Sequence, residues 1–203
     1  MERTKRIFDI IFSLMAVIFF LPMGIIIGAI IKWVSPGPIF HVCSRVGKDG
    51  EAIECWKFRT MCVDAPEKLR KILKENPSLR REWETFYKLK DDPRIFGFGK
   101  FLRKTSLDEL PQFLNVLRGD LSVVGPRPVT EEEVYKYFRD KADKILSVRP
   151  GLTGIWQTSD RNLLTFDERV RLEEQYVDEH SLLLDLRIIA KTIPAMFFAK
   201  GAY

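Results

Sequence analysis

The stretch IIFSLMAVIFFLPMGIIIGAII, residues 10–31, decides what kind of fold this chain can have. It contains 22 consecutive residues without a charge. A hydrocarbon core of about 30 Å needs roughly 20 helical residues, so the stretch is long enough to cross a bilayer. It is too long for a signal-peptide core, and Lys32-Trp33 follows it instead of a small-residue cleavage site. We therefore expect a membrane segment that stays in the mature protein.

Pro22 divides this stretch into parts of 12 and 9 residues, or about 18 and 14 Å of helix, and neither part spans a bilayer alone. Proline removes a backbone hydrogen bond and clashes with the preceding turn, which predicts a sharp bend. Two topologies remain, a kinked spanning helix and a re-entrant hairpin. Backbone groups in lipid need local hydrogen bonds, which favours the spanning helix. On physical arguments alone, the spanning helix is preferred. The hairpin is favoured by basic residues at both ends, namely Arg3, Lys5, Arg6, Lys32, Arg45 and Lys48.

The remaining sequence has the charge pattern of a single globular domain. The chain of 203 residues carries a net charge of +5, with basic residues interleaved among acidic ones in 68–90 and 131–144. Interleaved charges are typical of solvated helix faces, so we expect no nucleic-acid partner and favour anionic head groups or phosphorylated substrates. Three cysteines without a C-x-x-C pair exclude a disulfide or zinc framework. A phosphate-loop motif is also absent.

Local patterns predict a mixture of helices with a few strands. Turn residues at 47–50 join two β-type runs, 39–46 and 52–58, into a hairpin. A charged helical stretch is predicted at 67–90 with an interruption near Pro77, and further helices are predicted at 107–117, 130–147, 166–179 and 182–198. The helix at 107–117 is supported by leucines that recur on one face. A short strand is expected at 121–124.

An acidic pair, Asp108-Glu109, lies at the start of the helix predicted at 107–117. Ser106 and Glu109 have the spacing of a capping box, and Asp108 would favour the positive end of the helix dipole, so a purely structural interpretation is complete. A chemical interpretation also fits, because Arg103 lies just upstream. Two carboxylates beside a cation could hold Mg²⁺ against a phosphate, or one could act as a nucleophile. The pair alone leaves both interpretations open.

Gly125-Pro126-Arg127-Pro128 follows about twenty residues later. Its two prolines fix an extended backbone and would present Arg127 rigidly. A guanidinium held in this way matches phosphate oxygens with two hydrogen bonds. A plain turn is the alternative.

Together these residues resemble the monotopic phosphoglycosyl transferases, bacterial sugar transferases that begin the assembly of lipid-linked glycans. The resemblance extends in order over nearly the whole chain, and as a set the motifs are highly specific. It rests on Lys57-Phe58-Arg59-Thr60-Met61, Asp92-Pro93-Arg94, the segment 103–112 with its LDELPQ core, the segment 119–128, Arg149-Pro150-Gly151-Leu152-Thr153-Gly154, and Leu184-Asp185.

The family resemblance implies an α+β, mostly helical fold in a monotopic membrane protein. Residues 1–36 would form a re-entrant helix-break-helix with its break at Pro22, which reverses the preference for a spanning helix. Residues 37–203 would form a catalytic domain with a small β-hairpin. This domain would lie on the cytoplasmic face of the bacterial inner membrane, in contact with membrane lipids.

The resemblance also implies a Mg²⁺-dependent reaction. A hexose-1-phosphate would move from a UDP-sugar to polyprenyl phosphate, usually undecaprenyl phosphate, with release of UMP. Asp108 would attack the sugar-bearing phosphorus to give a covalent intermediate, and Glu109 would assist with the metal or with orientation. Asp108 and Glu109 are thus the expected metal ligands. The residues expected to bind substrate phosphates are Lys57, Arg59, Arg103, Arg127 and Arg161.

Some features are specific to this chain. Glu173 stands where relatives often carry an aspartate, and the extra N-terminal helices of longer relatives are missing, so the sequence looks like the catalytic unit alone, natural or excised. The ending Lys200-Gly201-Ala202-Tyr203 resembles members that use UDP-galactose or UDP-glucose. A homodimer is expected by analogy only. The competing hypothesis is a non-enzymatic membrane adaptor that binds anionic lipid or nucleic acid, which would not need the carboxylate pair.

Overall fold

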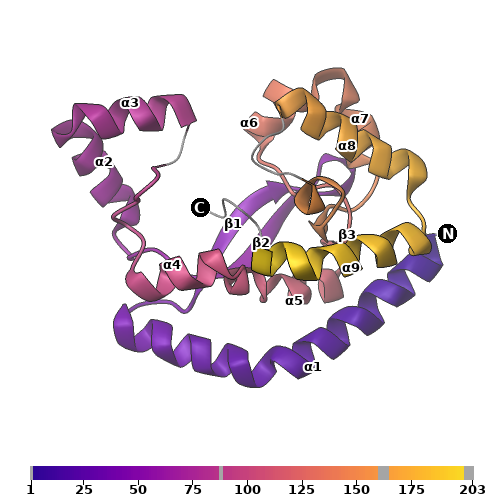
Figure 1. Ribbon diagram of the computed structural model, residues 1–203, viewed down its shortest axis with the longest axis horizontal. Helices are drawn as coiled ribbons and strands as arrows, with labels where there is room; N and C mark the ends of the chain where they lie inside the picture. The colour runs from indigo at the N-terminus through magenta and orange to yellow at the C-terminus, as the bar shows by residue number, and fades with distance from the viewer. Residues whose placement is uncertain (1, 87–88, 160–164, 199–203) are drawn as a thin grey trace.

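The computed structural model describes residues 2–86, 89–159 and 165–198, and within them the protein is mostly helical (Figure 1). In chain order the main elements are α1 (Glu2–Val34), β1 (Phe40–Val46), β2 (Ala52–Phe58), α2 (Ala65–Glu75), α3 (Pro77–Phe86), α4 (Gly97–Lys104), α5 (Gln112–Arg118), β3 (Ser122–Val124), α6 (Glu131–Glu133), α7 (Ala142–Leu146), β4 (Gly151–Thr153), α8 (Phe166–Glu179) and α9 (Leu182–Phe198). Short 3₁₀ or π turns cover η1 (Lys48–Gly50), η2 (Leu107–Glu109), η3 (Val134–Phe138), η4 (Arg139–Lys141) and η5 (Trp156–Thr158). The expectation of a mostly helical fold with a small β-hairpin is confirmed.

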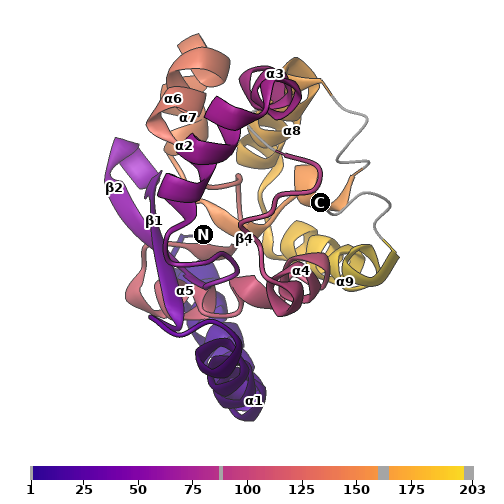
Figure 2. The ribbon, with the colours of Figure 1, turned by 90° about the vertical axis from the view of Figure 1, so that its left-hand side faces the viewer.

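Helix α1 contains the long apolar stretch and is the one helix among the described residues that is long and apolar enough to cross a membrane. It curves along one side of the molecule (Figure 1), and Figure 2 shows it nearly end-on at the same side. The expected helix-break-helix is wrong in one respect, because α1 stays helical through Pro22. Proline removes one hydrogen bond and bends a helix, but its φ angle is itself helical, so the turns on either side continue.

The N-terminal end of α1 is attached to the rest of the protein by polar contacts. Asp9 accepts hydrogen bonds from the Ser122 hydroxyl at 2.8 Å and from the Val123 backbone N–H at 3.1 Å. One turn earlier, Lys5 donates to the Asp185 carboxylate of α9 at 2.7 Å. Asp9 and Asp185 are both almost completely buried. Charged groups are buried only when they are paired and hydrogen-bonded, so these contacts fix where α1 begins on the domain.

The C-terminal half of α1 is attached by apolar packing instead. Ile27 and Ile31 are buried in one cluster with Phe58 of β2 and Leu102 of α4. The opposite side of α1 exposes large apolar side chains along its length, including Ile11, Ile18, Phe19, Ile25 and Trp33. Helix α1 therefore has a domain-facing side and an apolar side that nothing in the described chain covers.

Strands β1 and β2 form the predicted hairpin, antiparallel with Cys43 opposite Cys55. Helix α5 is fixed to β2 by Asn115, whose side-chain oxygen accepts the Trp56 backbone N–H at 3.0 Å and whose amide donates to the Glu54 carbonyl at 2.6 Å. The hairpin and the segment before α5 are thus held in one position relative to each other. The candidate site lies at this junction.

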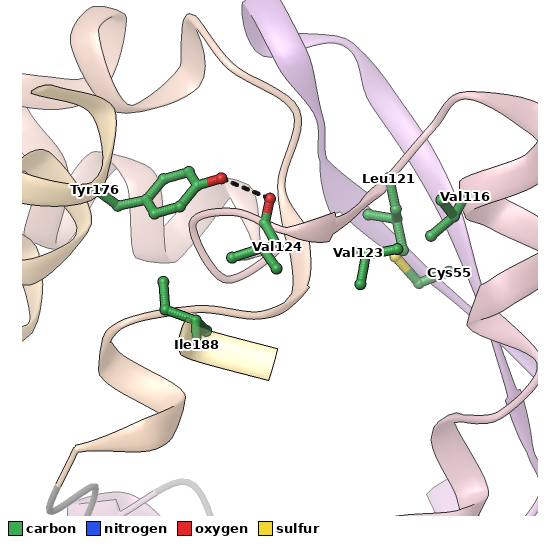
Figure 3. Close-up of a cluster of buried hydrophobic side chains, with 7 residues drawn as sticks. All are labelled: Cys55, Val116, Leu121, Val123, Val124, Tyr176 and Ile188. Carbon is green, nitrogen blue, oxygen red and sulfur yellow. Dashed lines mark hydrogen bonds between the residues drawn. The ribbon is translucent and has the colours of Figure 1, made fainter. Parts of the chain in front are cut away.

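The central core joins the hairpin to the C-terminal helices, as Figure 3 shows. Strands β3 and β4 pair in parallel, with Ser122 opposite Gly151. Tyr176 of α8 is buried beside them, and its hydroxyl lies 2.9 Å from the Val124 carbonyl and 2.8 Å from the Asp185 carboxylate. Buried apolar side chains from β2, α5, β3, α8 and α9 therefore form one continuous core.

Two regions depart from a regular helical pattern. Helices α2 and α3, separated at Pro77 as predicted, form an arm on the side of the molecule opposite α1 (Figures 1 and 2). The single helix predicted at 130–147 is broken into α6, η3, η4 and α7. Arg139 has a φ angle of 48°, which a right-handed α-helix cannot continue through.

Candidate active site

The acidic pair lies in the 3₁₀ turn η2 between α4 and α5. The helix predicted at 107–117 is therefore shorter than expected, since α5 begins only at Gln112. A proline in a helix clashes with the carbonyl four residues earlier, so Pro111 prevents a helix that would begin at Leu107. Ser106 has a φ angle of 55° and makes no side-chain cap. The predicted capping box is wrong, and both carboxylates are available for other contacts.

Glu109 contacts β2 instead of capping a helix. Its Oε1 accepts a hydrogen bond from Nζ of Lys57 at 2.6 Å, and both side chains are partly exposed. Lys57 lies next to the end of β2, whose position is fixed by Asn115. The structure thus brings together two of the predicted site residues across 52 positions of sequence.

Asp108 is the more buried of the two acids, with 8% of its surface exposed. Burial, together with the smaller effect of the negative charge of Glu109, raises the pKa of Asp108 to about 6 against the opposing charges of Lys57 and Arg103. A carboxylate in this environment is mostly ionised at neutral pH, yet it is less solvated and more basic than a carboxylate in water. Such a group is suited to act as a nucleophile.

Arg103 of α4 forms the cationic wall beside Asp108. Its Nε donates to the Thr60 hydroxyl at 2.9 Å. Burial lowers the pKa of Arg103, and the charges of Asp108 and Asp92 oppose this shift. Asp92 is itself held by Arg94, which makes bonds of 2.6–3.1 Å to both of its carboxylate oxygens. The Asp92-Pro93-Arg94 motif therefore holds a carboxylate close enough to Arg103 for their charges to interact.

A polar pocket extends from Glu109 and Lys57 towards Arg127. Its wall also contains Arg45, Gln112 and Gln157, which were missed as site residues in the sequence analysis. Arg45 had no motif of its own, and Gln157 reaches the pocket from a turn far along the chain. The LDELPQ core did contain a signal for Gln112. Three cationic side chains around one small pocket favour a substrate with several phosphate oxygens.

Arg127 is held in place by an aromatic ring and by a carboxylate. Its guanidinium lies 5.3 Å from the centre of the Trp156 ring, and its backbone N–H donates to the Glu173 carboxylate at 3.2 Å. Arg169 packs on the same ring at 4.5 Å. Burial raises the pKa of Glu173 to about 7. Glu173, where the family resemblance implies an aspartate, thus contacts the Arg127 backbone directly.

The Arg127 loop also depends on a close approach of two backbones. A Cβ atom on Gly151 would lie 2.0 Å from the backbone nitrogen of Gly125, and one on Gly125 would lie 2.5 Å from the Arg149 carbonyl. Only glycine fits at these positions. The matching Gly125-Pro126-Arg127-Pro128 and Arg149-Pro150-Gly151 motifs are therefore parts of one structure.

Other predicted site residues lie elsewhere. Arg59 is buried and donates to the Ser35 carbonyl just after α1, and it does not line the polar pocket. Arg161 lies outside the described residues. Pro22 lies within α1, away from the acidic pair in sequence and inside a continuous helix. The assignment of Arg59 and Arg161 to substrate phosphates stays a prediction.

The donor atoms at the acidic pair fit Mg²⁺ in part. Mg²⁺ prefers carboxylate oxygens and often takes its remaining ligands from water and substrate phosphates. The described residues contain no cluster of three or more His, Cys, Asp or Glu side chains. Asp108 and Glu109 would thus supply two carboxylates at most, as in sites where metal and phosphate bind together.

Comparison with known proteins supports the motif assignment. Residues 1–199 match the family model described as bacterial sugar transferase. The chain is 44% identical to the exopolysaccharide production protein ExoY of Sinorhizobium fredii, over 98% of this chain and 88% of that protein. It is 43% identical to the undecaprenyl-phosphate galactose phosphotransferase of Salmonella typhimurium, over 98% of this chain but 41% of that protein. It is also 36% identical to the UDP-glucose:undecaprenyl-phosphate glucose-1-phosphate transferase of Klebsiella pneumoniae, again over 98% of this chain and 41% of that protein.

These matches are consistent with the geometry, in which motifs spread over the sequence converge on one acidic pair and one cationic pocket. The likeness covers nearly the whole chain and exceeds 30% identity. The chain therefore belongs to the bacterial sugar transferase family.

Proposed function

We propose that this protein transfers a sugar 1-phosphate from a UDP-sugar to polyprenyl phosphate and releases UMP. The observation that carries the proposal is Asp108, a buried carboxylate of raised pKa beside Arg103 and a cationic pocket. Relatives named as galactose and glucose phosphotransferases of undecaprenyl phosphate support this reaction. They also favour UDP-galactose or UDP-glucose as the donor and undecaprenyl phosphate as the acceptor.

In the first step, a carboxylate oxygen of Asp108 forms a bond to the sugar-bearing phosphorus. The bond from this phosphorus to the bridging oxygen breaks, and UMP leaves with the electron pair. Arg127, Arg45 and Lys57 would hold the diphosphate in the polar pocket. Because these cations are already in place, they stabilise charge on the leaving group without reorganisation.

In the second step, a phosphate oxygen of the polyprenyl phosphate attacks the same phosphorus. The bond to Asp108 breaks, which restores the carboxylate and leaves a polyprenyl diphosphosugar. Each step exchanges one oxygen–phosphorus bond for another, so no proton has to be removed from an ionised Asp108.

The proposed cofactor is Mg²⁺, held by Asp108 and Glu109. When bound, it would neutralise charge on the phosphoryl oxygens of the reacting group. The contact of Glu109 with Lys57 orients one of the two carboxylates towards the pocket that would receive those phosphates.

We also propose a monotopic arrangement in which residues 1–36 enter and leave one leaflet on the same side. A spanning helix would carry one of its ends to the far side of the membrane. Here Asp9 near the start and Ile31 near the end of α1 are both buried against the same domain. Basic residues at both ends favour the cytoplasmic side. Residues 37–203 would then form the catalytic domain on the cytoplasmic face of the inner membrane.

The reaction is tested by intact-protein mass measurement after incubation with each of several UDP-sugars and Mg²⁺, without acceptor. We expect a phosphosugar adduct and one equivalent of UMP for the true donor, and neither product for Asp108→Asn. An adduct on the Asn variant would exclude Asp108 as the nucleophile. UMP release that requires the acceptor and leaves no adduct would instead indicate direct transfer.

The topology is tested in intact cells by labelling single cysteines placed at Thr4 and Ser35, in a variant without Cys43, Cys55 and Cys62. A membrane-impermeant reagent should reach neither site from the periplasm. Labelling of one site alone would exclude the monotopic arrangement.

A further inference from the structure

Helix α4 carries an aromatic pair between α1 and the acidic turn. The rings of Phe98 and Phe101 are stacked with their centres 5.9 Å apart, and Phe101 is 51% exposed. Phe98 packs against the buried cluster that contains Ile27 and Ile31 of α1. Figures 1 and 2 both place α4 beside the C-terminal half of α1. The aromatic pair thus continues the apolar surface of α1 towards the catalytic domain.

Cationic side chains border this aromatic pair. Lys104 is exposed and lies three residues after Phe101, and residues three apart lie on the same side of a helix. Lys100 is also exposed, one position before Phe101, and its amine is 3.9 Å from the exposed Asp91. An apolar strip that ends at lysines is complementary to an amphiphile with an anionic head.

The rest of α4 connects this apolar strip to the acidic turn. Arg103 of the same helix contacts Thr60 and lies close enough to Asp108 for their charges to interact. Leu107 and Leu110, on either side of Asp108, pack into the same cluster as Phe98. From the apolar side of α1, the surface of α4 therefore leads to the acidic turn.

We propose that α4 binds the lipid acceptor, with the polyprenyl chain against Phe98 and Phe101 and the phosphate near Lys104. This inference rests on the proposed function and adds the acceptor's subsite to it. The nucleotide sugar would use the other side of Asp108, because the polar pocket is lined by the β-hairpin, Arg127 and Gln157. Separate subsites let the acceptor phosphate reach the phosphorus that Asp108 carries after UMP has left.

The test compares Phe101→Ser and Lys104→Gln with the parent protein, using the full chain in lipid nanodiscs. The Michaelis constant for undecaprenyl phosphate should rise about tenfold in each variant, while that for the UDP-sugar stays within about twofold. With a short-chain prenyl phosphate in detergent, the effect of Phe101→Ser should disappear and that of Lys104→Gln should remain. The two variants should respond differently to chain length because the Phe101 ring would contact the hydrocarbon chain, whereas the Lys104 amine would contact the phosphate.

Leu183→Ser is the matched control, since Leu183 of α9 is a comparably exposed apolar residue at 59%. Equal increases in Leu183→Ser and Phe101→Ser would indicate general membrane contact and overturn the proposal. A rise in the constant for the UDP-sugar in Phe101→Ser would also overturn it. Failure of the parent protein to form the phosphosugar adduct would exclude the covalent mechanism, whereas the acceptor comparison would still be decided by steady-state UMP release.

Discussion

Two turns of this protein carry the same sequence signature of a helix start and fold differently. At Thr165, the hydroxyl accepts the Glu168 backbone N–H at 3.3 Å, and the Glu168 carboxylate accepts the Thr165 backbone N–H at 2.7 Å. At Ser106, with Glu109 at the same spacing, the hydroxyl makes no cap and the carboxylate binds Lys57. A local signature is therefore satisfied at α8 and overridden at the acidic turn.

The difference between the two turns indicates where the sequence serves chemistry. A capping carboxylate is fully used by the backbone of its own helix, whereas Glu109 faces a polar pocket. Ser106 meanwhile adopts a left-handed φ angle that a non-glycine residue rarely adopts. Violations of local preference are expected at functional sites, where other contacts compensate for them.

The largest expected effect comes from removing Asp108, which is buried, whereas the carboxylate at the corresponding place in α8 is exposed. Asp108→Asn should lower the rate of UMP release at least about a thousandfold, because an amide cannot form the phosphosugar bond. Asp167→Asn, at the corresponding place in α8, is the control and should leave the rate unchanged. A similar loss in both variants would contradict the assignment of chemistry to the acidic turn.

Asp108→Asn should also change stability, in the opposite direction to activity. Burial raises the pKa of Asp108 from 3.8 to about 6, so its ionisation opposes folding. In metal-free buffer the Asn variant should therefore be more stable by about 1–3 kcal/mol at pH 7. The difference should be absent below pH 4 and grow as the pH rises to about 6. Urea unfolding at several pH values measures this difference in stability. An Asn variant that is less stable than the parent protein at pH 7 would contradict the conclusion that ionisation of Asp108 opposes folding.

The variants Glu109→Gln and Glu168→Gln compare the two turns directly. Their effect on the rate should be smaller than that of Asp108→Asn. The first change should lower kcat about a hundredfold, and the second should leave kcat unchanged. Because the charge of Glu109 raises the pKa of Asp108, the acidic limb of the pH–rate profile should also move to lower pH in Glu109→Gln. An acidic limb of the pH–rate profile that stays in place in Glu109→Gln would show that Glu109 does not act on Asp108.

Elements with strong local signals could be predicted from the sequence. Helix α8 has the predicted bounds, and the β-hairpin differs only at its first residue. The short strand expected at 121–124 is β3, but β4 and its parallel pairing with β3 were missed, since a three-residue strand has no measurable periodicity and the two strands lie about thirty residues apart. The broken helix at 130–147 was missed as well, because nothing in its apolar pattern marks the positive φ angle of Arg139.

Site residues that belong to a sequence motif could be predicted, whereas those that reach the site only through tertiary contacts could not. Lys57 and Arg103 do lie beside the acidic pair, as the motifs implied. Arg45 lines the pocket only because β1 pairs with β2, a contact that its own sequence neighbours do not reveal. Arg59 illustrates the reverse, since a family motif contained it while its side chain binds the Ser35 carbonyl.

Loss of the working cap should have a moderate effect on stability alone. Thr165→Ala removes the hydroxyl that caps α8 and should lower the free energy of unfolding by about 1 kcal/mol. The steady-state rate should not change. Chemical denaturation measures the first quantity and UMP release the second. A loss of activity at conditions where the variant is fully folded would mean that this helix start also serves the site.

The smallest effect should come from the same kind of change at the overridden signature, and its sign should be reversed. Ser106→Gly removes no cap and relieves the positive φ angle, so the free energy of unfolding should rise by about 0.5 kcal/mol despite the added freedom of the unfolded chain. Ser147→Gly is the matched control. Ser147 has a φ angle of −65°, where glycine offers no relief, and this variant should lose stability. Equal losses in both variants by denaturant unfolding would show that Ser106 holds the acidic turn through its side chain, and the contrast between the two helix starts would then no longer hold.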